Sequence, residues 1–140
     1  MKERRQAREV ALQALYEIDC SGHTQAQALD HLCADEKLSD EGKQFATAIV
    51  QGVMQDQAEL DLIIAKHAPE WPVDQLAIVD RNILRIALYE LKSNPDVPIK
   101  VAINEAVELA KTFGSDTAPR FVNGVLGTFL QAHPAGELRR

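Results

Sequence analysis

The sequence is short of aromatic residues, of cysteines and of long hydrophobic runs, and each shortage excludes a class of protein. Aromatic residues make up only 5% of the 140 residues, while alanine, leucine, valine and isoleucine are plentiful, which favours helix over sheet. No apolar run approaches the ~20 residues that a membrane span needs. The basic start leads into an amphipathic segment and not into the apolar block of a signal peptide, so we expect a cytoplasmic protein without a membrane partner.

Two cysteines are too few for a disulfide framework, and in a reducing compartment we expect both to be small buried residues. Cys20 and Cys33 lie within fourteen residues of each other together with His23 and His31. Common zinc modules present their ligands as close pairs, which this spacing does not. We therefore predict no metal and no other cofactor.

The net charge of −6 argues against a general nucleic-acid binder, but the charge is unevenly distributed. All of the excess negative charge lies in residues 24–70, while the segments before and after are neutral. In the first eight residues a single acid, Glu3, opposes four bases: Lys2, Arg4, Arg5 and Arg8. The start of the chain is thus a cationic patch on an acidic protein.

Apolar residues recur at helical spacing throughout, and the alternation typical of strands is not sustained anywhere, so the predicted fold class is all-α with about seven helices. Cap residues and prolines set the expected limits. The expected helices are about residues 3–19 ended by Gly22, a short one after Thr24, one from Ser39 to about His67, one capped by Asp74 to about Lys92, one from Pro98 to Gly114, and one from about 117 to before Pro134.

The turn from Pro69 to Pro72 divides the chain into two helical halves, and neither half is large enough to fold stably alone. We expect a single domain over residues 1–134, with two small bundles sharing a core. Their limits are about 1–68 and about 73–134, and residues 135–140 form a flexible tail.

Arginines near the start of the first helix oppose the helix dipole, which prefers acids there. Arg4 and Arg8 share a face and Arg5 is adjacent, so a phosphate-binding face is one interpretation. A solvated helix start is the other. Arg120 beside Phe121 is a second candidate, because a cation next to an aromatic ring suits single-stranded RNA. The other interpretation is that Phe121 belongs to the core. Gly124 and Gly127, which follow within the same helix, indicate close helix–helix approach.

Nothing in the sequence supplies a nucleophile with its base, a metal quartet or a glycine-rich phosphate loop, so we predict that the protein is not an enzyme. Asp80, Arg81 and Arg85 lie on one predicted helix. They form either a surface ion-pair network, which adds little stability, or a surface for a partner protein.

Four stretches, in order and correctly spaced, resemble the NusB family over essentially the whole chain. They are RRQAREVALQALYEID at 4–19, VDRNILRIALYEL at 79–91, VPIKVAINEAVELAKTFG at 97–114 and RFVNGVLG at 120–127. The resemblance implies an all-helical fold of two three-helix sub-bundles. It also implies a bacterial transcription antitermination factor that binds boxA RNA of ribosomal RNA operons as a heterodimer with NusE, a ribosomal protein. The heterodimer then joins the elongating RNA polymerase with other Nus factors.

The resemblance assigns RNA contact to two sets of residues. The first is the arginine-rich start, with Lys2, Arg4, Arg5 and Arg8 and with Tyr16 further along the same helix. The second is Arg120 and Phe121. The surface for NusE maps to the helix that carries Asp80, Arg81 and Arg85. The alternative function is a helical protein-binding or homodimerisation module without RNA binding. An RNA methyltransferase domain of this family would need a fused methyl-donor domain, for which we expect no room in 140 residues.

Overall fold

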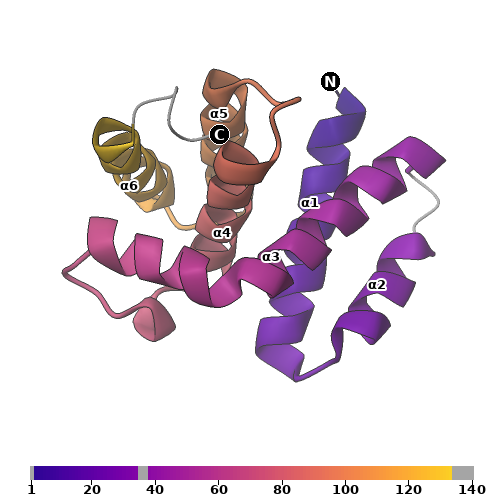
Figure 1. The fold of residues 1–140 in the computed structure, drawn as a ribbon. Helices are drawn as coiled ribbons and strands as arrows, with labels where there is room; N and C mark the ends of the chain where they lie inside the picture. The colour runs from indigo at the N-terminus through magenta and orange to yellow at the C-terminus, as the bar shows by residue number, and fades with distance from the viewer. Residues whose placement is uncertain (1, 35–37, 134–140) are drawn as a thin grey trace. The chain divides into compact units, whose positions relative to one another are not determined.

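The computed structural model describes residues 2–34 and 38–133, apart from the side chains of Lys2 and Cys33. In these residues every regular element is a helix, in the order α1 (Lys2–Ser21), α2 (Gln25–Cys33), α3 (Asp40–His67), the short 3-10 helix η1 (Val73–Gln75), α4 (Ile78–Ser93), α5 (Ile99–Phe113) and α6 (Ala118–Ala132). The predicted all-α class is confirmed (Figure 1). No described helix is long and apolar enough to cross a membrane.

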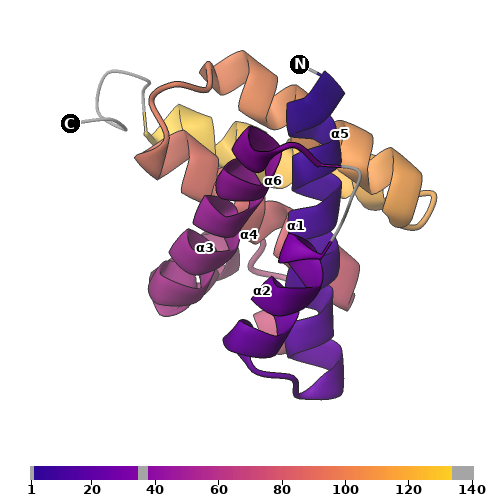
Figure 2. The same cartoon turned by 90° about the vertical axis from the view of Figure 1, so that its right-hand side faces the viewer.

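The chain forms two compact units, Met1–Gln55 and Asp56–Arg140, and α3 contributes to both. In the first unit α2 packs against α1 and runs back along it (Figures 1 and 2). In the second unit α4, α5 and α6 pack on one another. The predicted sub-bundle limits, about 1–68 and 73–134, stay a prediction. The predicted tail, 135–140, lies outside the described residues.

The first unit is built from the apolar stripe of α1. Ala7, Ala11, Ala14 and Leu15 are buried, as their helical spacing predicts. Gly22 ends the helix with a φ of 74°, a left-handed conformation that glycine adopts without strain. The chain can therefore turn back at once into α2.

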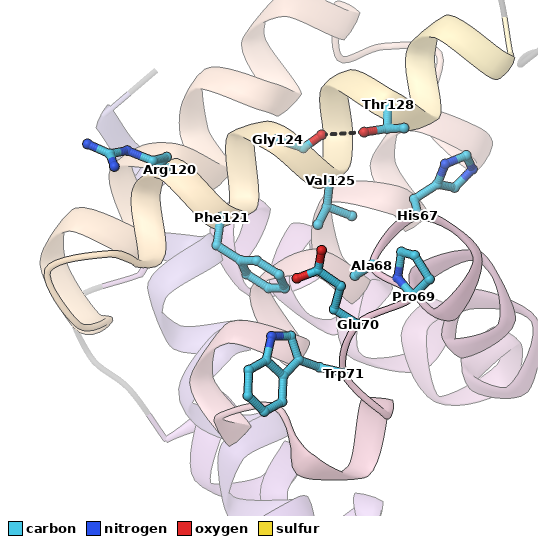
Figure 3. A pocket seen from close by; sticks show the side chains of 10 residues that line it. All are labelled: His67, Ala68, Pro69, Glu70, Trp71, Arg120, Phe121, Gly124, Val125 and Thr128. Atoms are coloured by element: carbon cyan, nitrogen blue, oxygen red, sulfur yellow. Dashed lines mark hydrogen bonds between the residues drawn. The ribbon is translucent and has the colours of Figure 1, made fainter.

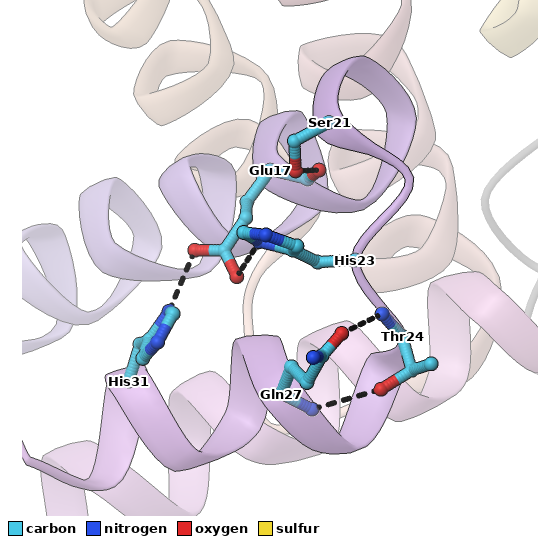
Figure 4. Close-up of polar contacts among 6 residues, drawn as sticks. All are labelled: Glu17, Ser21, His23, Thr24, Gln27 and His31. Atoms are coloured by element: carbon cyan, nitrogen blue, oxygen red, sulfur yellow. Dashed lines mark hydrogen bonds and ion pairs between the residues drawn. The ribbon is translucent and has the colours of Figure 1, made fainter.

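Two sets of polar contacts fix the turn between α1 and α2 (Figure 4). Thr24 and Gln27 form a reciprocal capping box: Thr24 Oγ1 accepts from the Gln27 N–H at 3.1 Å, and Gln27 Oε1 accepts from the Thr24 N–H at 2.7 Å. The Glu17 carboxylate on α1 meets Nδ1 of His31 at 2.9 Å and Nδ1 of His23 at 3.0 Å. The hydrogen bond with His31, and then that with His23, holds the pKa of Glu17 below its usual range. Glu17 thus joins the last turns of α1 to α2.

Cys20, predicted to be buried, is exposed, so this prediction is wrong. It lies on the same side of α1 as the exposed Tyr16, one turn away, outside the apolar stripe. The side chain of Cys33 lies outside the described residues. Within the part of the chain that is described, no three His, Cys, Asp or Glu side chains are placed to hold a metal ion.

The second unit differs from its sequence prediction at the start of α4. Asp74 was expected to cap this helix, but it lies inside η1, and Leu76 then adopts an extended conformation with a ψ of 150°. The helix begins only at Ile78, after Ala77, without a side-chain cap. Arg81 instead ties the turn to α4, since its Nη1 donates to the Asp74 carbonyl oxygen at 3.3 Å.

Candidate nucleic-acid interface

The start of α1 places two arginines on one aromatic ring. The guanidinium of Arg4 lies 4.7 Å from the centre of the Phe45 ring on α3, and that of Arg8 lies 5.2 Å from it. Both distances are within the range of cation–π attraction. Arg4 is exposed, whereas Arg8 is only 3% exposed. Of the two, Arg4 offers its charge to a ligand, and Arg8 packs the helix against Phe45.

Glu3 is bound within the first unit and does not simply oppose the arginines. One of its carboxylate oxygens accepts from the Ser39 N–H at 2.9 Å, and it also accepts from the Ser39 hydroxyl. These bonds to Ser39 hold the pKa of Glu3 below its usual range. Ser39 Oγ in turn accepts from the Gly42 N–H at 3.2 Å, so Ser39 caps α3 as predicted. The carboxylate therefore ties the first turn of α1 to the start of α3.

A shallow cavity of ≈ 440 Å³ opens beside Arg4. Its lining carries both signs of charge, because the acids Glu3 and Glu41 line it together with Arg4. Phe45 adds an aromatic ring to the same lining. A Cβ on Gly42 would come within 2.9 Å of a Glu3 oxygen, so glycine permits this approach. Arg4, which is exposed, is one of the residues that line this cavity.

The other predicted residues of α1 lie along the same helix. Arg5 is exposed. Tyr16 is 41% exposed, and its hydrogen bond with Cys20 raises the pKa of the phenol. Lys2 begins the helix, but its side chain lies outside the described residues. Spacings of three and four residues run from Arg5 to Tyr16 through Glu9 and Leu12, so the two share one side of α1.

Arg120 and Phe121 lie in the second unit, at the start of α6, where they border a cavity of ≈ 330 Å³. The opposite wall is the last residue of α3, His67, and the turn that follows it, from Ala68 to Trp71. Arg120 is exposed and Phe121 is half-buried, so the ring is neither core nor free surface. Figure 3 shows the Phe121 ring and the Trp71 indole bordering the same opening.

The structure contradicts the prediction that Gly124 and Gly127 allow close helix–helix approach. Both residues are exposed, and a Cβ built on either one would have no atom within 4 Å beyond its chain neighbours and the nearby backbone of α6. At this end of the second unit it is Gly114 that needs the space, because a Cβ there would lie 2.5 Å from that of Ala118 and 2.9 Å from the Ala110 carbonyl oxygen. The α5–α6 turn, and not the middle of α6, is the close approach.

The three residues of the predicted partner surface have different surroundings. Arg85 is buried and binds Asp61 on α3 in a bidentate pair, with Nε–Oδ1 at 2.8 Å and Nη2–Oδ2 at 2.9 Å. Its Nη1 donates to Asn82 Oδ1 at 3.1 Å. Asp80 and Arg81 are half-buried, and burial raises the pKa of Asp80. Arg85 thus joins α3 to α4 inside the second unit, while the first turn of α4 presents Asp80 and Arg81.

From the sequence, Phe45 was missed and no role was assigned to Trp71. The helical period of α3 assigns Phe45 to the apolar face, and nothing in the sequence pairs that face with the arginines of α1. Trp71 lies in a turn between two prolines, where periodicity gives no indication of burial. Its presence as the single tryptophan of a chain poor in aromatics is the only signal that marks it.

The fold and the two surfaces define a class of small all-helical proteins that present arginine beside an aromatic ring. A model of the NusB family matches residues 5–131. The chain therefore belongs to the NusB family. The transcription antitermination protein NusB of Dehalococcoides mccartyi is 46% identical over 129 residues, which cover 92% of this chain and 90% of that protein. The protein of the same name from Bacillus subtilis is 48% identical over 123 residues, 88% of this chain and 91% of its own.

The fold of this chain is also similar to solved structures of NusB proteins. NusB from T. maritima superposes with a TM-score of 0.85 at 33% identity, covering 93% of this chain and 92% of that one. A chain from a crystal structure of the antitermination factors NusB and NusE in complex with double-stranded RNA has a TM-score of 0.82 at 28% identity, covering 95% of this chain and 99% of its own.

Proposed function

We propose that this protein is a transcription antitermination factor that binds boxA RNA of ribosomal RNA operons as a heterodimer with NusE. In this role it joins the elongating RNA polymerase together with other Nus factors. It acts in the cytoplasm as an adaptor and catalyses no reaction.

The observation that carries the proposal is the similarity, over almost the whole chain, to a chain from a crystal structure of NusB and NusE in complex with double-stranded RNA. Membership of a family whose relatives are named transcription antitermination proteins supports the same function. We expect the boxA segment to bind single-stranded, since unstacked bases present their edges to protein side chains.

The geometry at the start of α1 supports a phosphate contact by Arg4. The guanidinium carbon of Arg4 lies over the Phe45 ring, and the N–H donors of a guanidinium lie in its plane, at the edge. The ring therefore restricts the side chain while its donors can meet a ligand oxygen, which lowers the entropy lost on binding. Arg5 adds a second exposed cation on the next residue.

The other residues take roles set by their burial. Arg8, beneath Arg4, positions Phe45, and Tyr16 and Lys2 extend the RNA contact along α1. Arg120 and Phe121 form the second contact, a cation for a phosphate and a ring for a base. We propose Asp80 and Arg81, with Arg85 as their support, for the surface that binds NusE.

A fluorescence-anisotropy titration of a short single-stranded boxA-type RNA tests the proposal, with and without NusE and beside a scrambled RNA. We expect weak binding by the protein alone, because it is acidic overall, and tighter, boxA-selective binding with NusE. Equal affinity for boxA and scrambled RNA in the presence of NusE would contradict the proposal and favour a protein-binding module.

A charge-matched pair of variants locates the RNA contact. Arg4→Ala with Arg5→Ala removes two exposed cations from α1, and Lys100→Ala with Lys111→Ala removes two from α5. We expect weaker boxA binding only in the first variant. Arg8 is left unchanged, because replacing a buried arginine would disturb the packing of α1 on α3.

A further inference from the structure

The cavity between α6 and the turn after α3 is lined partly by residues to which no RNA contact has been assigned. Its volume of ≈ 330 Å³ is at the small end of ligand pockets, which span about 300–1,000 Å³. A site of this size suits one small planar group. Besides Arg120 and Phe121 it is lined by Glu70, Trp71 and Gly124.

Trp71 presents an aromatic surface at this cavity. Its side chain is 56% exposed although it is the largest apolar residue of the protein. The indole lies at the mouth of the cavity, on the opposite wall from the Phe121 ring (Figure 3). Two aromatic side chains at one opening are the arrangement that stacks nucleobases, and each stacked base contributes ~1–3 kcal/mol.

Glu70 adds a hydrogen-bond acceptor to the lining of the cavity. Its carboxylate points toward the Phe121 ring and Val125 (Figure 3). An ionised carboxylate only accepts hydrogen bonds. It therefore favours a base that offers an amino group, as cytosine, adenine and guanine do, over uracil, whose carbonyl oxygens it would repel.

Gly124 leaves the α6 wall of the cavity bare. Apart from its chain neighbours and the nearby backbone of α6, no atom lies within 4 Å of a Cβ built there, and glycine inside a helix costs about 1 kcal/mol relative to alanine. Its carbonyl oxygen is already bound by Thr128 Oγ1 at 2.7 Å, so the backbone itself is satisfied. The missing side chain keeps the cavity open to a flat group.

We propose that Trp71, Phe121 and Glu70 form a slot for a single RNA base that carries an exocyclic amino group, with Arg120 on the adjoining phosphate. This inference rests on the proposed RNA-binding function and adds Trp71, Glu70 and Gly124 to its residues. The slot reads one base, while the α1 arginines hold the backbone without regard to sequence.

The experiment fills the slot without disturbing the fold. Gly124→Leu and Gly127→Leu both place a side chain into open space on α6, but only position 124 lines the cavity. Anisotropy titrations of boxA-type RNA with NusE present compare the two variants with the original protein. We expect about tenfold weaker binding for Gly124→Leu, the loss of one stacked base, and no change for Gly127→Leu.

The single tryptophan gives a direct second readout. We expect RNA to quench the fluorescence of Trp71, measured as the difference from a Trp71→Phe protein with the same NusE. RNAs that each carry one abasic position identify the base in the slot, because the abasic RNA fails to quench. Replacing that base by uracil should weaken binding to the original protein and have less effect on Glu70→Gln.

The remaining outcomes separate the slot from the proposed function. RNA that binds equally to all three proteins without quenching Trp71 would overturn the slot and leave the function standing. If boxA-type RNA fails to bind the original protein with NusE, the proposed function fails and the slot fails with it. If NusE alone changes the fluorescence of Trp71, and Gly124→Leu weakens NusE binding only, the cavity holds a protein segment and the inference is wrong.

Discussion

At the scale of single residues, charge and position decide what each arginine does. Arg4 and Arg8 contact the same Phe45 ring, yet one is exposed and the other is buried. Arg85 is buried as well, against Asp61, where a bidentate pair compensates for the loss of hydration. The sequence marked all three as cations on helices, but burial depends on which helix lies opposite.

The Arg85–Asp61 pair predicts an asymmetry in stability. Asp61→Ala leaves a buried cation without its carboxylate, which should lower the free energy of unfolding by about 3–5 kcal/mol. Arg85→Ala leaves an Asp61 side chain that is 26% exposed and can be hydrated, so its loss should be smaller. Urea denaturation followed by circular dichroism measures both. Equal, small losses in the two variants would show that the pair contributes little.

The glycines of α6 give a second prediction at this scale. Gly124→Ala and Gly127→Ala add a Cβ in open space and remove the entropic cost of helical glycine, so each should raise the stability by about 1 kcal/mol. Gly114→Ala is the contrasting variant and should lower it by about 1–3 kcal/mol, because the new Cβ collides with Ala118 and the Ala110 carbonyl. Thermal unfolding orders the four proteins, and a loss in both α6 variants would be inconsistent with the open space described.

At the scale of the elements, periodicity and caps predicted most helices well. Gly22 and Gly114 end their helices as expected, and Thr24 and Ser39 cap theirs with side-chain bonds. The prediction failed at Asp74, where the sequence has a good cap but the chain makes a separate 3-10 turn. A cap residue shows where a helix could begin, whereas the packing of the following apolar residues determines where it does begin.

The candidate site was predicted only in part, for a related reason. Arg120 and Phe121 are neighbours in the sequence, so the sequence alone predicted that a cation and an aromatic ring lie side by side. Trp71 joins them only because the turn after α3 lies opposite α6 in the second unit. Such long-range proximity comes from the tertiary fold, and no local pattern in a single sequence encodes it.

The Glu17 contacts between α1 and α2 make their stability depend on pH. The pKa of Glu17 is lowered in the folded protein, so its stabilisation is present above the pKa of the unfolded chain and is lost as the pH falls through the folded pKa. The difference in stability between the original protein and Glu17→Gln should therefore shrink between about pH 5 and about pH 3. Urea titrations at several pH values measure it, with Glu9→Gln on the same helix as the control. A difference that stays constant down to the lowest pH would rule out this role.

At the scale of the whole molecule, an acidic protein of net charge −6 has to bind a polyanion locally. The mean field of the protein repels RNA, and the exposed arginines of α1 act over about the Debye length, ~10 Å at 0.1 M salt. This balance explains why we expect weak binding by the protein alone and a dependence on NusE for affinity. It also predicts a shallow salt dependence, since few phosphates are neutralised.

The salt dependence of RNA binding tests the central claim, that Arg4 and Arg5 hold RNA phosphates, most directly. For single strands the logarithm of the affinity falls with the logarithm of the salt concentration by ~0.7 for each phosphate contact. With NusE present, Arg4→Ala with Arg5→Ala should therefore reduce this slope by about 1.4, and Lys100→Ala with Lys111→Ala should leave it unchanged. The same slope in all three proteins would contradict the account, because the phosphates would then be held elsewhere.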